Sequence, residues 1–519
     1  MPDQHSLANQ LDEQKRKCLD EARPEAVEYQ HQRGKLTARE RVALLLDDDS
    51  FNEFGALVIP DCEGRIEPEH VADGLITGWG TINQRAVLLC SADYTVNGGS
   101  NGSLGLKKMQ RCFELALAHG VPSVQLLEGV GHRISEGLDS RLFAEGVASI
   151  AVQAGLSGWV PTVAAVLGPS FAAMTIVASL CDFVVMVRGT SALGIAPPPL
   201  VKAAIGETID TQALGGADVQ ANRNGVADYL VDTEADAMAI IRQYLSYFPQ
   251  NADEKAPVVD AKPPDPDFAR SLATLIPEDK RTPYNVKHAI YGIVDQGSVL
   301  EVKAGYARNI VCCLARIGGQ SIGIIANQTN YLAGALDSPA CEKASHFLCL
   351  CDAFGIPILS LMDLPGFMVG KDAESSKLAR RSARLFYEFA RISVPSYTVV
   401  LRKAFGAAYM AMNGGRSYKA DLSLAWPTAE FAAMNVETAI NVAYKRQIAS
   451  AAEPDKARAD ITAKVRKNLG PLRAASGFGI DDVISPEQTR DYLLQAMNRS
   501  GKRKAGRSGV PRHRHIPPI

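Results

Sequence analysis

The residue types most often used for catalysis form no recognisable arrangement in this chain. The sequence contains no G-x-S-x-G turn, no Walker A motif and no H-E-x-x-H helix, so the usual nucleophile, phosphate and zinc signatures are missing. None of the 9 histidines stands with Cys or carboxylates at metal-site spacing, and no metal is predicted. His132, just past an expected strand, could act as a base, but a lone histidine there is more often structural.

Four turns rich in glycine or alanine could instead aim backbone N–H groups at a reacting oxygen. Each leads into an expected helix, and the first residues of a helix have N–H groups without intrahelical partners. Two such groups aimed at one oxygen form an oxyanion hole. The four turns are Gly129–Gly131, Phe171–Ala173, Pro365–Phe367 and Phe405–Ala407. A fifth loop, with Gly98 and Gly99, could hold a phosphate ahead of the helix expected at Lys107.

These turns recur because the chain repeats itself at a nearly constant spacing. The segment Gly120–Glu128 matches Gly355–Asp363, and Phe171-Ala-Ala matches Phe405-Gly-Ala. Two copies of one domain predict a duplicated fold. A duplicated fold in turn favours a site that is built from two related halves.

Short apolar runs alternate with helical stretches inside each copy. The runs 121–127 and 356–362 are expected strands, and each follows an amphipathic stretch, at 107–118 and 342–353. Strands that are apolar on both faces and alternate with helices predict a buried, largely parallel sheet in an α/β fold.

Prolines and charges mark the expected domain limits. Residues 1–50 are expected to form a helical arm, 51–250 the first domain, and 284–497 the second. Between the domains, 251–283 is predicted to be a linker because its repeated prolines block helix and central strand. Residues 498–519 form a basic tail.

Composition narrows the class of protein. A net charge of −2 gives no electrostatic case for binding nucleic acid. The stretch 147–181 carries no charge, but Gly and Pro interrupt it, so a buried core is expected rather than a membrane span. Scattered cysteines without a C-x-x-C pair, behind a polar and charged N-terminal segment, favour a reducing, cytoplasmic compartment.

From about Gly34 onward the chain resembles the carboxyltransferase (β) subunits of biotin-dependent acyl-CoA carboxylases, such as those of propionyl-, acetyl- and methylcrotonyl-CoA. The resemblance rests on many ordered matches rather than on one motif. They include Gly-Lys-Leu-Thr-Ala-Arg-Glu-Arg (34–41), Cys-Asp-Ala-Phe-Gly-Ile-Pro (351–357), Asp-Leu-Pro-Gly-Phe-Met-Val-Gly (363–370), Leu-Arg-Lys-Ala-Phe-Gly-Ala-Ala-Tyr (401–409) and Ala-Trp-Pro-Thr-Ala-Glu (425–430). The resemblance implies two tandem crotonase-like (ClpP-like) domains, each a ββα superhelix.

The same resemblance implies the reaction and the partners. Biotin, carried by a biotin carboxylase and biotin carrier (α) subunit, delivers a carboxyl group to an acyl-CoA, and backbone N–H groups hold the thioester enolate and the ureido oxygen. The chain has neither a biotinyl segment nor an ATP-binding region, so the partner must supply both. A homo-hexamer, a trimer of dimers, is also implied.

Residue roles carry over by position. The oxyanion groups expected to be catalytic are Gly406, Ala407, Gly131, Ala172 and Ala173. Asp421, ahead of Trp-Pro-Thr, is expected to border the acyl pocket. The other expected substrate contacts are Arg133, Gly98, Gly99, Gly366 and Phe367.

The first domain departs from the common family pattern. Asp-Ser-Gly-Gly-Ala-Arg-Ile is replaced by Glu128-Gly-Val-Gly-His-Arg-Ile, and Gly-Pro-Cys-Ala-Gly-Gly-Ala by Gly168-Pro-Ser-Phe-Ala-Ala-Met. These changes imply a reshaped acyl pocket. Two alternatives stay open: the carboxyltransferase core of an acyl-CoA decarboxylase or transcarboxylase, and a non-catalytic scaffold paralogue.

Overall fold

The computed structural model describes residues 4–60, 68–129, 131, 133–138, 140, 144, 149–418, 420–501, 503 and 514–518. The chain divides into two compact units. Unit 1 comprises Met1–Glu254 with His513–Pro518, and unit 2 comprises Lys255–Arg512 with Ile519. Each unit has its own 8-stranded sheet.

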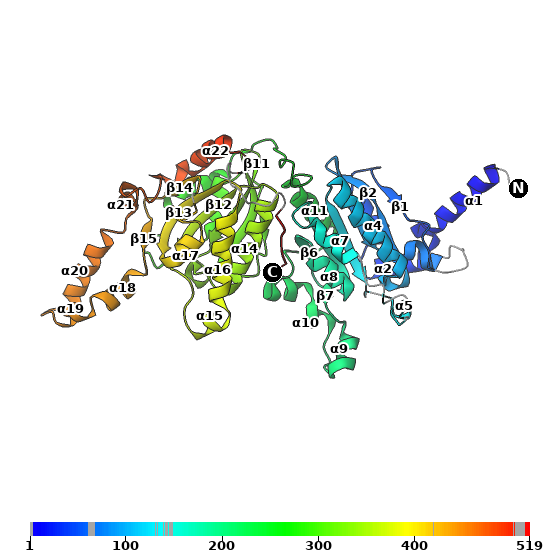
Figure 1. Ribbon diagram of the computed structural model, residues 1–519, viewed down its shortest axis with the longest axis horizontal. Helices are drawn as coiled ribbons and strands as arrows, with labels where there is room; N and C mark the ends of the chain where they lie inside the picture. Colours follow the sequence, from blue (N-terminus) through cyan, green and yellow to red (C-terminus); the bar gives the residue numbers. More distant parts are fainter. Residues whose placement is uncertain are drawn as a thin grey trace. The chain divides into compact units, whose positions relative to one another are not determined.

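The sheet of unit 1 has the order β1-β2-β3-β4-β5-β6-β8, with β7 paired to β5. Figure 1 shows this sheet with helices α4, α7 and α11 beside it. The first three strands pair antiparallel, and from β3 onward all pairs are parallel. The strands are β1 (Asn52–Phe54), β2 (Leu75–Ile82), β3 (Arg85–Ala92), β4 (Ser123–Gly129), β5 (Thr162–Phe171), β6 (Phe183–Val187), β7 (Ala192–Gly194) and β8 (Tyr229–Val231).

Helices cover both faces of this sheet, which explains why its central strands are apolar on both sides. Helices α4 (Ser103–His119) and α7 (Ser149–Leu156) pack together on one face. Helices α3 (Ala38–Leu45) and α11 (Glu234–Ser246) pack together against the sheet as well. The remaining helices of this unit are α1 (Gln4–Lys17), α2 (Pro24–Gln32), α5 (Ile134–Gly137), α8 (Ala173–Ser179), α9 (Pro198–Ile205) and α10 (Thr211–Gly215).

Unit 2 repeats this topology with the strand order β16-β14-β13-β12-β11-β10-β9 and with β15 paired to β13. Its strands are β9 (Leu300–Val302), β10 (Ile310–Ile317), β11 (Gln320–Asn327), β12 (Ile358–Leu364), β13 (Ser396–Phe405), β14 (Leu422–Ala425), β15 (Glu430–Ala432) and β16 (Asp482–Val483). The α/β class and its duplication are therefore as predicted, and each central strand begins two residues later than expected for 121–127 and 356–362.

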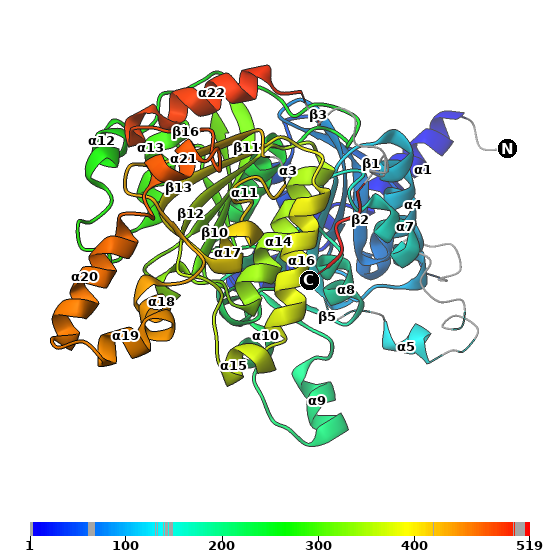
Figure 2. The same cartoon turned by 60° about the vertical axis from the view of Figure 1, so that its left-hand side comes forward.

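The helices of unit 2 also lie in layers against their sheet (Figure 2). Helices α14 (Ser338–Ala353) and α16 (Leu378–Arg391) pack together, and α13 (Val286–Ile293) and α22 (Thr489–Arg499) join the core cluster around β10, β11 and β13. The others are α12 (Pro266–Ser271), α15 (Lys371–Ser375), α17 (Gly406–Ala411), α18 (Val436–Ala443), α19 (Lys445–Ala449), α20 (Pro454–Arg466) and α21 (Pro471–Ser476).

The proline-rich segment 251–283 differs from the expected irregular linker because it contains α12. Pro266 occupies the first turn of this helix, where a missing N–H costs nothing, and the Asp265 side chain accepts from the N–H groups of Asp267 and Phe268. From residue 149 on, the uncharged stretch 147–181 contains α7, β5 and α8. No helix among the described residues is long and apolar enough to cross a membrane.

Candidate active site

The first half of the candidate site lies in unit 1, where two parallel strands end side by side. Strand β5 runs through Phe171 into Ala172, and α8 begins at Ala173. A side-chain carbon built on Gly131 would lie 3.2 Å from Ala172 Cβ and 3.8 Å from Ala173 N. The structure thus brings Gly131, Ala172 and Ala173 together, at the carboxyl edge of a parallel sheet where ligands of such folds bind.

Ala172 has a backbone conformation that suits glycine. Its φ is +55° and its ψ −118°, which an L-residue with a Cβ adopts only under strain. Its N–H donates to the Gly194 carbonyl at 3.0 Å. That bond ties β5 to β7, so the Ala172 N–H is already used, and Ala173 is the better placed donor of the pair.

The second half of the site lies at the equivalent edge of unit 2. There β13 ends at Phe405, and α17 begins at Gly406, whose φ is +67°. A Cβ on Gly406 would meet only the Ala433 carbonyl, at 3.4 Å. Gly406 and Ala407 are the first two residues of the helix, so their N–H groups have no intrahelical partner.

An open pocket of about 510 Å³ borders this second turn. Phe405 and Lys403 belong to its wall, together with charged residues of both signs. Burial lowers the pKa of Lys403. The other lining residues are Glu278, Asp279, Lys280, Arg281, Glu430, Asn435, Val436, Glu437 and Arg466.

Gly366 and Phe367 follow β12, as Gly131 follows β4 in unit 1. Gly366 has a φ of +137° and open space where a side chain would be. Its carbonyl accepts from Leu336 N at 3.1 Å, and Phe367 forms an isolated bridge with Leu336. The turn is therefore held by the segment before α14 while leaving room above it.

A buried carboxylate stands directly behind each half-site, at the end of the central strand. In unit 1 it is Glu128, which pairs with Lys35 and, at 2.6 Å, with Arg41. In unit 2 it is Asp363, which accepts from Arg402 Nε at 2.8 Å and from Lys403 N at 3.1 Å. Burial raises the pKa of Asp363 and lowers that of Lys35.

A left-handed glycine packs against the backbone of each of these carboxylates. A Cβ on Gly99 would lie 2.3 Å from the Glu128 carbonyl oxygen, and one on Gly334 would lie 2.5 Å from the Asp363 carbonyl oxygen. Only glycine fits at such distances. Gly99 is therefore explained by packing, whereas Gly98 has nothing within 4 Å of a built Cβ.

The phosphate cradle expected ahead of α4 stays a prediction, and two carboxylates already accept from N–H groups in the first turn of that helix. Glu136 accepts from Ser103 N, and Asp73 accepts from Gly105 N, both at 2.7 Å. Arg133 joins the two, at 2.7 Å from Asp73 and 2.8 Å from Glu136. A substrate would have to share this guanidinium with two acids.

Asp421 lies at the opposite edge of the sheet from Gly406. Its carboxylate accepts from Ser396 N at 2.8 Å, at the start of β13, so the length of that strand puts roughly 30 Å between them. Its counterpart in unit 1 is Asp182, which accepts from Thr162 N at 2.9 Å. The repeat therefore gives Asp421 a strand-capping role, and its part in an acyl pocket stays a prediction.

Two further expectations concern His132 and metal binding. His132 lies outside the described residues. No group of three or more His, Cys, Asp or Glu within the described part of the chain is arranged to hold a metal ion.

Sequence reasoning missed the cations behind the strand ends. Lys35, Arg41 and Arg402 stand out in the sequence only as parts of matching motifs, and Lys35 and Arg41 lie far from Glu128 along the chain. A carboxylate at the end of an apolar strand is the sequence signal that could have predicted these cations, because a buried charge requires a partner somewhere in the chain.

The chain is similar to known proteins over nearly its whole length. A family described as the carboxyl transferase domain matches residues 29–516. The carboxyltransferase subunit of propionyl-CoA carboxylase from Haloferax mediterranei is 36% identical over 517 residues, which cover 98% of each chain. The α subunit of methylmalonyl-CoA decarboxylase from Veillonella parvula is 37% identical over 499 residues, or 95% of each chain.

Among solved structures, transcarboxylase 12S with methylmalonyl-CoA and methylmalonic acid bound superposes with a TM-score of 0.91. It is 36% identical in sequence, and the match covers 100% of this chain and 99% of the other. The expected pair of crotonase-like domains is thereby confirmed.

Proposed function

The chain belongs to the carboxyl transferase family, and we propose that it is the subunit that transfers a carboxyl group from carboxybiotin on a partner protein to the α or vinylogous carbon of an acyl-CoA. The observation that carries this proposal is the duplicated turn: Phe171–Ala173 and Phe405–Ala407 open a helix at the carboxyl edge of each sheet. Two oxyanions develop in the reaction, and the chain offers two sets of backbone donors.

The chemistry of the donors suits both oxyanions. When bound, carboxybiotin would supply CO2 by breaking the bond between its ureido nitrogen and the carboxyl group; the freed nitrogen would then accept the α-proton of the acyl-CoA, and the enolate so formed would add to the CO2. The N–H groups of Gly406 and Ala407, beside the open pocket, fit the ureido oxygen, which is only a hydrogen-bond acceptor. The N–H of Ala173, with Gly131 beside it, fits the thioester oxygen of the acyl-CoA.

The substrate contacts beyond these donors belong to the same proposal. Gly98 and Arg133 lie on the side of Gly131, whereas Gly366 and Phe367 lie beside the turn at the end of β12. The assignment of acyl-CoA to unit 1 and of biotin to unit 2 follows the implied division of labour in the family. A cytoplasmic location stays a prediction.

We further propose that the chain works with a biotin carboxylase and biotin carrier subunit and assembles as a homo-hexamer. Support comes from relatives that are described as biotin-dependent carboxylase subunits and from the hexamer assembly described for transcarboxylase 12S.

Reconstitution tests this function. The purified chain, alone, should not fix labelled bicarbonate into acyl-CoA with ATP, and activity should appear when a biotinylated partner is added. A panel of acetyl-, propionyl-, butyryl- and methylcrotonyl-CoA would identify the substrate. Robust ATP-dependent carboxylation by the chain alone, or none with any biotinylated partner, would contradict the proposal.

A second candidate is the core of an acyl-CoA decarboxylase or transcarboxylase. It is favoured by the identity to the Veillonella parvula decarboxylase subunit, which is as high as the identity to the carboxylase subunit. Such an enzyme would release carboxyl groups from methylmalonyl-CoA to biotin without ATP and would not reach the carboxylated product from bicarbonate and ATP. The reconstitution above therefore separates the two.

A further inference from the structure

The acyl-CoA half-site has a support that the biotin half-site lacks. Glu128, fully buried at the end of β4, accepts on Oε1 from Lys35 Nζ and on Oε2 from Arg41 Nη2 at 2.6 Å. Gln30 Nε2 adds a third donor at 3.1 Å. All three donors come from the N-terminal segment that precedes the repeat.

This cluster balances its own charge in the interior. Arg41 also holds Glu234 on α11, with nitrogen–oxygen distances of 2.7 and 2.8 Å. Two cations thus face two carboxylates, and each of the four residues is at most 7% exposed. Removing one member leaves an uncompensated buried charge, which is the costly way to break such a group.

The cluster touches both strands that carry the turns of the half-site. A Cβ on Gly168, three residues before Phe171 on β5, would lie 2.5 Å from Glu128 Oε1 and 2.5 Å from Lys35 Nζ. On β4 the backbone of Glu128 and Gly129 packs against Gly99 with no room for a side chain. Glu128 therefore contacts β5 through its side chain and Gly99 through its backbone, at the point where the chain leaves β4 toward Gly131.

The buried carboxylate of unit 2 is paired without a cation from the N-terminal arm. Asp363 takes its cation, Arg402, from the neighbouring strand β13 of the same repeat. The carboxylate is common to both copies, but only unit 1 draws its cations from the arm.

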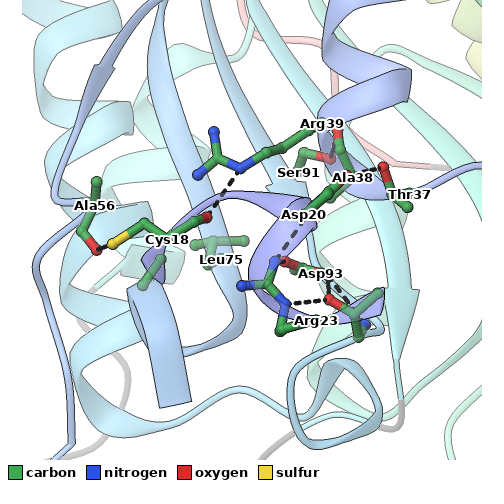
Figure 3. Close-up of polar contacts among 12 residues, drawn as sticks. Cys18, Asp20, Arg23, Thr37, Ala38, Arg39, Ala56, Leu75, Ser91 and Asp93 are labelled. Atoms are coloured by element: carbon green, nitrogen blue, oxygen red, sulfur yellow. Dashed lines mark hydrogen bonds and ion pairs between the residues drawn. The ribbon is translucent and has the colours of Figure 1, made fainter. Parts of the chain in front are cut away.

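The arm, which belongs to unit 1, is held against the sheet region of that unit by contacts of its own (Figure 3). Arg23 pairs with Asp93 at 3.2 Å, and the Ala38 carbonyl accepts from Ser91 Oγ at 3.4 Å. Arg39 donates to the Cys18 carbonyl at 3.1 Å and pairs with Glu53 at 2.9 Å. Lys35 and Arg41 therefore reach Glu128 from a docked segment.

On these grounds we propose that Lys35 and Arg41 are positioning residues for the acyl-CoA half-site: they hold Glu128, and through it the turn that carries Gly131 beside Ala173, whereas the biotin half-site does not depend on the arm. This rests on the proposed function for the assignment of substrates to the two halves. A displacement of the order of 1 Å at a reacting group costs about 10²-fold in rate.

The test compares Lys35→Met, Glu128→Gln and the double variant. Each single change leaves one unmatched charge, whereas the double change leaves Arg41 matched with Glu234. Lys35→Met should lower kcat for acyl-CoA carboxylation about 10²-fold, with the KM for free biotin unchanged in the reverse reaction. The double variant should recover most of the loss, and Lys35→Arg should retain activity.

Arg16→Met is the control, because it removes an exposed cation from α1 of the same arm rather than one of the contacts that dock the arm or hold Glu128. It should leave kcat near the wild-type value. Equal losses in Arg16→Met and Lys35→Met, or a double variant no better than the single one, would overturn the proposal.

Hydrogen exchange provides a readout that needs no activity. In folded Lys35→Met, amides of β4 and α8 should exchange faster, while those of β12 and α17 should not change. Faster exchange in both units, or in neither, contradicts the proposal. Hydrogen exchange can be measured even if the wild-type chain carboxylates no acyl-CoA. Such a lack of activity would contradict the proposed function but not the positioning role of Lys35.

Discussion

Single backbone N–H groups are the smallest units on which the proposed reaction depends. Ala407 is the second residue of α17, where proline is tolerated, so Ala407→Pro deletes one donor with little expected harm to the helix. We expect kcat to fall by about 10²–10³-fold, the usual loss for one oxyanion donor. Steady-state kinetics of the reconstituted complex would measure this.

Ala379→Pro is a suitable control for that change, because Ala379 is the exposed second residue of α16. It should leave turnover unchanged. If Ala407→Pro folds and turns over like the wild type, the N–H of Ala407 takes no part in catalysis.

Ala172 offers a test of strain at the residue scale. Its φ of +55° and ψ of −118° are suited to glycine, so Ala172→Gly should relieve strain. After subtraction of the larger backbone entropy of glycine, the expected gain is about 1 kcal/mol. Thermal unfolding would show it as a raised midpoint.

The opposite substitution, glycine to alanine, can be made at the equivalent position of unit 2. Gly406, at the equivalent position with a φ of +67°, should lose stability as Gly406→Ala. A lowered midpoint for Ala172→Gly would mean that the alanine methyl packs well enough to outweigh the strain.

At the scale of elements, each unit joins a helix to its sheet through one buried lysine. Lys343 on α14 donates to the carbonyls of Lys303, Tyr306 and Ile310 at 2.8 to 2.9 Å. Lys108 on α4, its counterpart, donates to the carbonyls of Ala72 and Leu75. Burial lowers the pKa of each lysine to about 8.

The lowered pKa of Lys343 makes the free energy of unfolding depend on pH. Because the folded pKa of Lys343 is about 8 and its ordinary value is 10.5, the unfolded chain binds more protons between these values. The free energy of unfolding should therefore rise with pH between these two values. Below pH 8 the burial of the charged Lys343 lowers the free energy of unfolding by its full amount. Relative to Lys343→Met, the wild type should gain roughly 2 kcal/mol between pH 7 and pH 10.

Urea unfolding of both proteins at the two pH values measures that difference. Lys464→Met, on the exposed face of α20, serves as the control and should show no such change. A constant difference between wild type and Lys343→Met would show that the lysine stays charged throughout the window.

Elements also show what could be predicted from sequence and what could not. The nearly constant spacing of the repeat predicted the paired turns at Ala172 and Gly406, because local pattern and repeat agree there. The place of Asp421 in a pocket stays a prediction. Its hydrogen bond to Ser396 at the start of β13 could not be predicted from local pattern, and the equivalent pair Asp182–Thr162 in unit 1 reveals it. The arm cations behind Glu128 depend on contacts between distant segments, which no local pattern encodes.

At the scale of the whole molecule, the duplication suggests where complete sites form. Each copy offers one set of oxyanion donors, so two chains related by a two-fold axis could place unit 1 of one against unit 2 of the other, twice. Such a pairing would give two sites per dimer. This arrangement agrees with the proposed hexamer.

Complementation between two inactive variants tests this arrangement. Ala173→Pro should impair only the acyl-CoA half and Ala407→Pro only the biotin half, since each lies in the first turn of its helix. In a mixed dimer with shared sites, one site carries both changes and the other carries neither. After full subunit exchange, half of the dimers are mixed, so activity should rise to about a quarter of the wild-type value. If activity stays at the level of the separate variants although exchange is demonstrated by mass-tagged subunits, each chain carries its own complete site.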